Sequence, residues 1–198
     1  MTREVVTLAL FPLRTVLFPG GLLPLRIFET RYVDMVRNCM REQVPFGVVL
    51  LLEGAEAGGL SCFATLGTSA RIADFDPLPD GLLGISCRGE RKFRVLRHWR
   101  AADLLNMGEV EWLGDEPSES LPQRHALLRG LLEQAMAKVG QHYDNWEQQL
   151  DDASWIGYRL SELMSLPVEE RQRSLELADP IERIDWLAPM LDTAADPS

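Results

Sequence analysis

The sequence predicts an α+β protein: a small β-barrel with one inserted helix, followed by a C-terminal helical bundle. Up to residue 112 the chain consists mostly of short apolar segments between turn-forming Gly and Pro residues, which is typical of barrel strands. The polar segment 115–120 ends this pattern, and apolar residues then recur at helical spacing. We therefore expect a barrel domain over residues 1–113 and a helical bundle over residues 118–192.

The charge distribution supports this division. The formal net charge is −10. Residues 1–112 contain 13 Lys and Arg against 13 Asp and Glu, whereas residues 113–198 contain 7 against 17. The whole net charge therefore lies in the second part, where we expect a solvated acidic face and a role different from that of the first part.

Short strands are expected in the first part. The turn signal at residues 19–21 precedes one of them, and residues 77–81 and 89–90 are expected to turn the chain between others. A flexible loop is expected over residues 54–59, inside a hairpin. The expected strands are residues 5–10, 22–27, 46–52, 60–65, 69–75, 82–88, 91–99 and 104–112.

One helix is expected inside the barrel, over residues 29–42. Its apolar side chains fall on one stripe at helical spacing, and its charged side chains lie on other faces. The stripe consists of Tyr32, Val33, Val36, Cys39 and Met40.

Helices in the second part are expected around residues 128–139 and 155–164. Pro167 is expected to open a shorter third helix, since the first turn tolerates its missing N–H. Asp179 is expected to cap the last helix, with Pro180 in its first turn.

Cysteine content and hydropathy favour a cytoplasmic protein. The cysteines Cys39, Cys62 and Cys87 form no CxxC pair, so we expect free thiols and neither a disulfide framework nor a structural zinc site. No apolar run approaches the roughly 18 residues of a membrane span. The N-terminus lacks the features of a signal peptide, so no membrane partner is expected.

No catalytic constellation stands out. A phosphate-binding GxxxxGK[ST] loop is missing, and residues 84–88 are a poor nucleophile elbow, with an arginine where the second glycine belongs. We therefore expect no enzyme, no catalytic residue, no metal and no cofactor. The alternative, a cryptic hydrolase, requires Ser86 or Cys87 to lie within about 3.2 Å of a histidine. The histidines are His98, His125 and His142.

A basic cluster between Arg88 and Arg100 keeps a second alternative open. It contains six basic residues with Phe93 and Trp99 among them. Basic groups interleaved with aromatic rings are typical of single-stranded nucleic-acid binding, so an RNA-binding protein is possible. The negative net charge opposes binding of polyanions. We expect instead a strand with Phe93 inward and the basic charges offset by acidic groups.

Residues 11–29, FPLRTVLFPGGLLPLRIFE, closely resemble the opening of the Lon protease N-terminal domain family, in which PLR, FPG and PL elements follow at this spacing. The resemblance covers roughly residues 5–190. Further matching segments are GVV at 47–49, GTSARI at 67–72, LPDG at 78–81, GERKFRV at 89–95, LPVEERQ at 166–172 and DPIER at 179–183.

The resemblance implies a PUA-like barrel followed by a helical bundle, without catalytic residues of its own. In that family the domain recognises and holds protein substrates. The resemblance therefore implies a non-catalytic module that binds unfolded or exposed polypeptide segments, with an adaptor to a protease or a chaperone as one form of this role.

An exposed apolar groove is expected on the barrel or at its junction with the bundle. Apolar groups on loops over a rigid scaffold suit a peptide, because burial must offset the cost of ordering a disordered chain. The loop at Leu17 and Phe18 and the hairpin at residues 75–83 are expected to expose such groups. The candidate peptide-binding residues are Leu17, Phe18, Phe28, Tyr32, Phe75 and Leu78.

Overall fold

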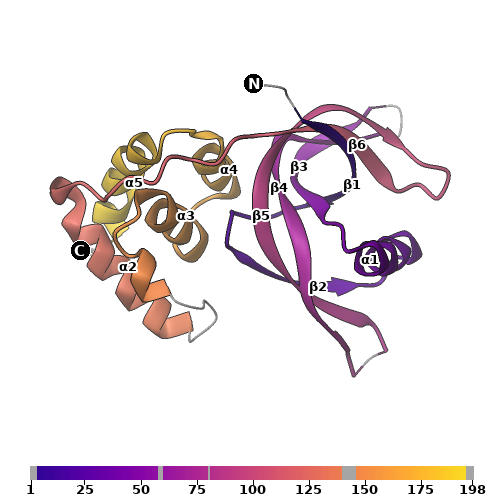
Figure 1. Ribbon diagram of the computed structural model, residues 1–198, viewed down its shortest axis with the longest axis horizontal. Coiled ribbons are helices and arrows are strands. Elements are labelled where there is room, and N and C mark those ends of the chain that lie inside the picture. Colours follow the sequence, from indigo (N-terminus) through magenta and orange to yellow (C-terminus); the bar gives the residue numbers. More distant parts are fainter. Residues whose placement is uncertain (1–3, 58–59, 80, 140–145, 195–198) are drawn as a thin grey trace. The chain divides into compact units, whose positions relative to one another are not determined.

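The structure is a computed structural model that describes residues 4–57, 60–79, 81–139 and 146–194 (Figure 1). The chain divides into two compact units that meet between Gly114 and Asp115. A six-stranded sheet with one inserted helix forms the first unit, and helices form the second. This architecture confirms the predicted α+β class.

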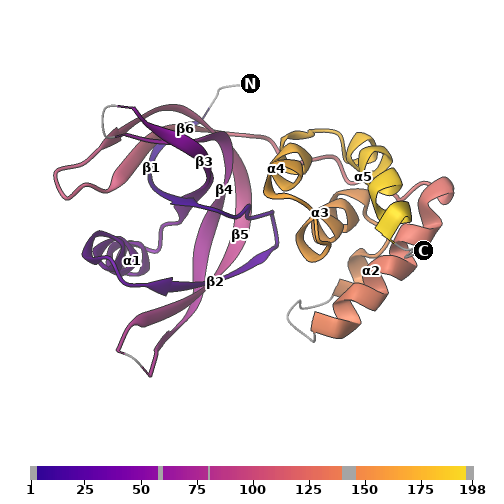
Figure 2. The same cartoon turned by 180° about the vertical axis from the view of Figure 1, so that it is seen from behind.

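The strands of the first unit form a sheet that curls into a ring (Figures 1 and 2). Its order is β2-β5-β4-β3-β1-β6, and β6 pairs in addition with β5. Strands β1 and β3 are parallel, and the other pairs are antiparallel. The strands are β1 (Val5–Leu13), β2 (Leu22–Ile27), β3 (Phe46–Ala57), β4 (Leu60–Pro77), β5 (Leu83–Arg100) and β6 (Asn106–Trp112).

Strand β5 runs straight through residues 89–90, so the turn predicted there is wrong. The Gly89 N–H donates to the Gly21 carbonyl at 2.9 Å, and the Gly89 carbonyl accepts from the Gly20 N–H at 2.8 Å. A Cβ on Gly89 would lie 2.1 Å from the Phe18 carbonyl oxygen. The glycine is therefore needed for the close approach of another backbone segment and not for a turn.

Two further predicted breaks also belong to strands. Residues 60–65 and 69–75, expected as separate strands, form one strand, β4, which has shifts of register against its neighbours. Strand β3 continues through residues 54–57, where a loop is predicted, while residues 58–59 lie outside the described part of the chain. The sequence pattern is interrupted where the register shifts, because a β-bulge bends a strand around a barrel without ending it.

Helix α1 (Thr30–Glu42) packs its apolar side against the core of the ring. Tyr32, Val36 and Cys39 of the predicted stripe are buried, together with Met35, which the stripe did not include. The Tyr32 ring stacks on Phe11 of β1, with ring centroids 4.0 Å apart and planes inclined by 23°. The helix is thus fixed to the barrel by the face that the sequence predicts.

In the second unit, helix α3 contacts the three other α-helices. Asp179 caps the last helix as predicted, since its Oδ1 accepts from the N–H groups of Ile181 at 2.8 Å and Glu182 at 3.0 Å. Pro167 is the N-cap of α4 (Val168–Glu176), directly before its first residue. The helices are η1 (Gln123–His125), α2 (Ala126–Val139), η2 (Trp146–Gln149), α3 (Ala153–Leu163), α4 (Val168–Glu176) and α5 (Pro180–Ala194).

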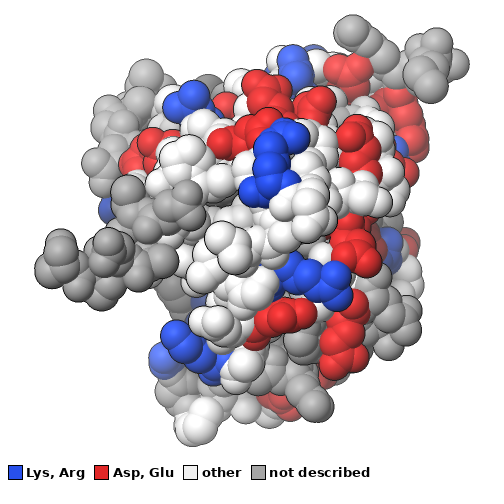
Figure 3. Space-filling view, turned by 90° about the vertical axis from the view of Figure 1, so that its left-hand side faces the viewer, with Lys and Arg blue, Asp and Glu red and all other residues white. Residues whose placement is uncertain are grey.

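A buried ion pair, which sequence analysis missed, connects the start of the second unit to α5. The Arg183 side chain is fully buried and lies 2.6 Å from Glu116. The Tyr158 hydroxyl donates to Glu116, and burial raises the pKa of that hydroxyl, which keeps it a donor. On the face drawn in Figure 3, acidic and basic side chains are interspersed with uncharged ones. Glu116 is not part of a solvated acidic face, because its side chain is only 9% exposed.

The helices of the described residues include none that is long and apolar enough to cross a membrane.

Candidate functional site

Two of the six candidate residues are buried and line none of the three pockets described below. Leu17 and Phe18 are only 3% and 1% exposed, so the prediction that their loop exposes apolar groups is wrong. The Phe18 carbonyl accepts from the Gly21 N–H at 2.9 Å and lies against Gly89 of β5. The loop is therefore held down on the sheet, and its apolar side chains belong to the interior.

The other four candidates line two neighbouring pockets of the first unit that share Leu25 and Arg26 of β2. Phe75 and Leu78 line one pocket, which we call the Leu78 pocket. Phe28 and Tyr32 line the other, which we call the Phe28 pocket. Strand β2 thus joins candidate residues from two separate segments of the sequence, residues 28–32 and 75–78.

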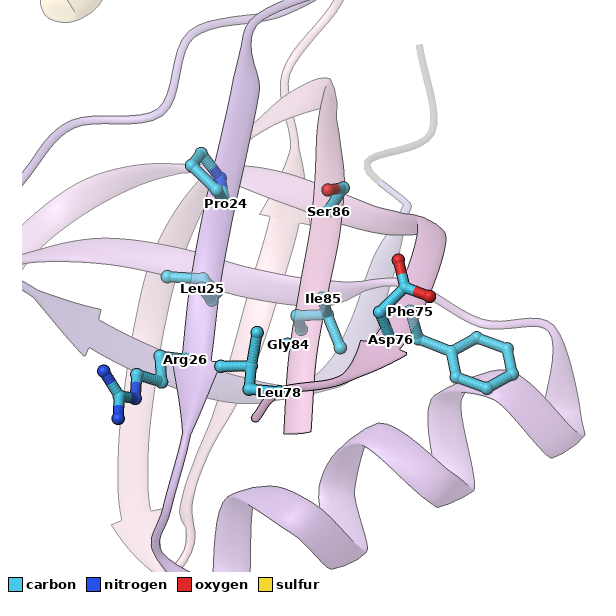
Figure 4. Close-up of a pocket in the computed structure, with 9 residues that line it drawn as sticks. All are labelled: Pro24, Leu25, Arg26, Phe75, Asp76, Leu78, Gly84, Ile85 and Ser86. Atoms are coloured by element: carbon cyan, nitrogen blue, oxygen red, sulfur yellow. The ribbon is translucent and has the colours of Figure 1, made fainter. Parts of the chain in front are cut away.

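The Leu78 pocket has a volume of about 340 Å³ and lies where β2, β5 and β4 run side by side (Figure 4). Leu25, Ile85 and Phe75 are neighbours in register across these strands. Leu78 lies over Gly84, and a Cβ there would be 3.0 Å from the Leu78 Cδ2 atom. The lining residues are Pro24, Leu25, Arg26, Phe75, Asp76, Leu78, Gly84, Ile85 and Ser86.

The Phe28 pocket has a volume of about 360 Å³ and lies at the ends of β1 and β2, beside the start of α1. Phe28 is 71% exposed, whereas Tyr32 is 6% exposed and contributes to the pocket wall. Burial raises the pKa of the Tyr32 hydroxyl. The lining residues are Phe11, Pro12, Leu13, Arg14, Leu25, Arg26, Ile27, Phe28, Glu29, Arg31, Tyr32 and Leu51.

A third pocket, the Cys39 pocket, has a volume of about 430 Å³ and lies between α1 and strands β1 and β6. No pattern in the sequence indicates this pocket. Burial raises the pKa of the Cys39 thiol to about 11, which makes this group unreactive near neutral pH. The lining residues are Val6, Thr7, Leu8, Ala9, Met35, Asn38, Cys39, Glu42, Val44, Pro45, Leu105, Met107 and Trp112.

The geometry does not favour the hydrolase alternative. Cys87 is completely buried, and burial raises the pKa of its thiol to about 12. Ser86 lines the Leu78 pocket, whose lining residues include no histidine. His98 packs on Phe63 with ring centroids 4.6 Å apart.

Of the two remaining histidines, His125 lies in the second unit, 2.5 Å from Asp185. His142 is outside the described residues. The described residues also contain no group of three or more His, Cys, Asp or Glu that could hold a metal ion.

Two of the six basic residues of the cluster on β5 lie beside acidic side chains. Arg97 lies 2.7 Å from Glu109, and Arg91 lies 3.6 Å from Glu4. Phe93 is completely buried, as predicted, so its ring is not available for stacking on a base. The nucleic-acid alternative therefore lacks one of its two aromatic groups.

Apolar pockets with a few polar groups at their rims are typical of binding domains. The first unit of this chain has such pockets in a curled sheet with one inserted helix, and a helical unit follows it in the sequence. The family model described as the ATP-dependent protease La (LON) substrate-binding domain matches residues 7–193. The chain belongs to the Lon substrate-binding domain family.

The relatives are full-length Lon proteases and separate N-terminal domains. The Lon protease of Cytophaga hutchinsonii is 25% identical over 93% of this chain and 24% of its own length. The Lon protease of Escherichia coli K12 is 22% identical over 98% of this chain and 25% of its own length. The chain thus spans about a quarter of the curated relatives that it matches.

Solved structures agree with this assignment. A Lon N-terminal domain protein from Xanthomonas campestris is 38% identical, with a TM-score of 0.78, over 93% of this chain and 98% of that one. The N-terminal domain of the Mycobacterium avium complex Lon protease has a TM-score of 0.67 at 18% identity, over 98% of this chain and 100% of that one, which shows a shared fold.

Proposed function

We propose that this chain is a non-catalytic module that binds unfolded or exposed polypeptide segments through the Phe28 and Leu78 pockets. The observation that carries the proposal is the exposure of two aromatic side chains on the walls of these pockets. Phe28 is 71% exposed and Phe75 is 51% exposed. Membership of a family described as the substrate-binding domain of an ATP-dependent protease supports a polypeptide as the ligand.

Exposed aromatic side chains on a rigid sheet are suited to this task. Covering a large apolar side chain contributes roughly 1.5–3 kcal/mol relative to leaving it in water. Phe75 lies on β4, which pairs with β5, and Phe28 directly follows β2, which also pairs with β5. The backbone at both residues is therefore already ordered, and binding costs the protein little conformational entropy. An unfolded segment with apolar side chains gains this burial at both pockets, whereas a folded protein keeps such side chains inside.

The form of the function that we propose is an adaptor, which presents bound polypeptides to a protease or a chaperone. Membership of the substrate-binding domain family supports the binding of polypeptides in this role.

The test is binding of a labelled polypeptide to the full chain, followed by fluorescence anisotropy. The ligand is reduced and carboxymethylated α-lactalbumin, and its native, disulfide-bonded form is the folded control. The double variant Phe28→Ala/Phe75→Ala is expected to weaken binding of the unfolded form by about tenfold or more, since 1.4 kcal/mol corresponds to a factor of ten. The matched control is Leu127→Ala, which removes an apolar side chain that is 81% exposed in the second unit.

An unchanged affinity in the double variant would show that the site is wrong. If the folded wild-type chain binds neither form of the ligand, the polypeptide-binding function itself is refuted.

A further inference from the structure

We propose that Leu104, in the loop between β5 and β6, is a further contact residue for the unfolded polypeptide segments that this chain binds. This inference rests on the proposed function and adds one anchoring side chain to the surface beside the Phe28 pocket. It follows from the backbone conformation of Leu104, from the exposure of its side chain and from a hydrogen bond that ties the loop to the pocket wall.

The loop is a tight hairpin connection of three residues, Ala102, Asp103 and Leu104. The Ala101 N–H donates to the Leu105 carbonyl at 2.9 Å, and the Leu104 N–H donates to the Ala101 carbonyl at 3.0 Å. These two bonds are typical of a three-residue β-hairpin loop, in which the last residue adopts a left-handed conformation. Leu104 has a φ of 66° and therefore occupies that last position.

Glycine is the residue that ordinarily stands at this position, because it adopts a positive φ without strain. A leucine there costs stability, since its Cβ lies too close to the following carbonyl oxygen. In the described part of the chain, the only other non-glycine residue with a positive φ is Gln43, the C-cap of α1, where this conformation is common. A strained residue that the surrounding contacts hold in place is typical of a functional position.

The Leu104 side chain lies outside the core. It is 57% exposed, whereas its neighbour Leu105 is 8% exposed and belongs to the core of the ring. Among the large apolar side chains in the described part of the first unit, only Phe28, at 71%, has a higher exposed fraction. The strained backbone therefore presents an apolar side chain to solvent, and packing within the first unit does not account for a leucine at this position.

Arg31 connects the loop to the Phe28 pocket. Its guanidinium donates to the Leu104 carbonyl at 2.9 Å and lies 2.6 Å from Glu29. Both Arg31 and Glu29 line the Phe28 pocket. In the two ribbon views, the loop between β5 and β6 lies on the same side of the ring as α1, whose first turn contains Arg31 (Figures 1 and 2). The most exposed apolar side chains of this unit, Phe28 and Leu104, thus adjoin the same arginine.

An unfolded polypeptide is the occupant that this surface fits. Leu104 lines none of the three pockets, so a compact ligand confined to the Phe28 pocket leaves its side chain in water. An extended segment advances about 3.3 Å per residue and therefore reaches beyond the pocket. Apolar side chains at separate positions of such a segment gain burial against both Phe28 and Leu104.

The test measures two quantities for each full-length variant. Binding of reduced and carboxymethylated α-lactalbumin is followed by fluorescence anisotropy, and the urea midpoint is followed by circular dichroism. Leu104→Gly is expected to weaken binding about fivefold, since roughly half of the burial energy of a leucine is lost. Its urea midpoint is expected to equal or exceed that of the wild type, because glycine relieves the positive φ. Weaker binding without lower stability separates a ligand contact from a structural role.

Two further variants serve as controls. Gln43→Gly places a glycine at a positive φ in the same unit, at an exposed residue that lines none of the three pockets. It is expected to bind the unfolded ligand like the wild type. Leu104→Met keeps an apolar side chain on the same strained backbone and is also expected to keep wild-type binding.

Several outcomes would overturn the inference. Wild-type affinity in Leu104→Gly excludes a contact, and a urea midpoint clearly below that of the wild type assigns Leu104 to the fold. Equal losses of affinity in Leu104→Gly and Leu104→Met, or in Leu104→Gly and Gln43→Gly, exclude a specific effect of the apolar side chain. In these cases the proposed function stands as long as Phe28→Ala/Phe75→Ala weakens binding. If the folded wild-type chain does not bind the unfolded ligand, the proposed function fails as well.

Discussion

Gly89 of β5 lies so close to the loop before β2 that a Cβ on it would be 2.1 Å from the carbonyl oxygen of Phe18. Backbone hydrogen bonds between Gly89 and residues 20–21 fix this contact. Backbone atoms cannot move aside as the end of a flexible side chain can. This one relationship explains both why a glycine stands inside a strand and why the loop side chains of Leu17 and Phe18 are buried.

Gly89→Ala is therefore expected to lower the free energy of unfolding by about 1–3 kcal/mol or more, as overpacking substitutions do. The matched control is Gly130→Ala in α2, where a Cβ would meet no atom within 4 Å. That substitution is expected to raise stability by up to about 1 kcal/mol, because Ala has the higher helix propensity. Urea unfolding followed by circular dichroism measures both. Equal stability of the two variants would contradict the close contact between Gly89 and the Phe18 carbonyl.

The strands were predictable where apolar pattern and turn chemistry agree, as for β2, whose bounds match the predicted segment 22–27. The pattern fails at Gly89 because a glycine marks either a turn or a close backbone approach. The segment that approaches it lies far away in the sequence. A single sequence does not contain the pairing of β2 with β5 that would decide between the two.

The candidate site was predictable only in part, for the same reason. Phe28 and Phe75 are exposed, and of the two places where apolar groups are predicted to reach the surface, the hairpin exposes Phe75 whereas the loop at Leu17 and Phe18 is buried. The residues that join them, Leu25 and Arg26, look like ordinary strand residues in the sequence. Their role depends on β2 lying between two pockets, which only the sheet topology shows.

The buried ion pair between Glu116 and Arg183 leads to a second stability prediction. Glu116→Ala leaves the buried guanidinium without its carboxylate and is expected to cost about 3–5 kcal/mol. Asp34→Ala is the control, because it breaks an exposed pair with Arg37 and is expected to change stability by about 0.5 kcal/mol or less.

The double variant Glu116→Leu/Arg183→Met separates the charge from the packing. It is expected to be less destabilised than Glu116→Ala, because it leaves no unpaired buried charge. Urea midpoints of the four proteins provide the comparison. A double variant that is less stable than Glu116→Ala would show that hydrogen bonds from Arg183 to backbone carbonyls, such as that of Ser174 at 2.9 Å, matter more than the pair.

A contact between η1 and α5 leads to a prediction on how the stability of the second unit depends on pH. Hydrogen bonds from His125 and, secondly, from Arg124 lower the pKa of Asp185 below its ordinary value of 3.8. His125 lies 2.5 Å from Asp185, and the Arg124 guanidinium lies 2.9 Å from it. Because these groups bind the ionised carboxylate, its protonation removes the contacts.

The sign of the effect follows from this depression. A carboxyl group whose pKa is lower in the folded than in the unfolded state stabilises the fold fully at pH values above the unfolded pKa, near 3.8. This contribution is lost as the pH falls through the folded pKa. Asp185→Asn is therefore expected to lower the urea midpoint at pH 6, and its difference from the wild type is expected to shrink steadily below about pH 4. Arg124→Gln, which keeps the carboxylate and removes one donor, is expected to show a smaller difference of the same sign. Parallel midpoint curves for the wild type and Asp185→Asn between pH 6 and pH 2 would mean that this carboxylate is not held more strongly in the folded chain than in the unfolded one.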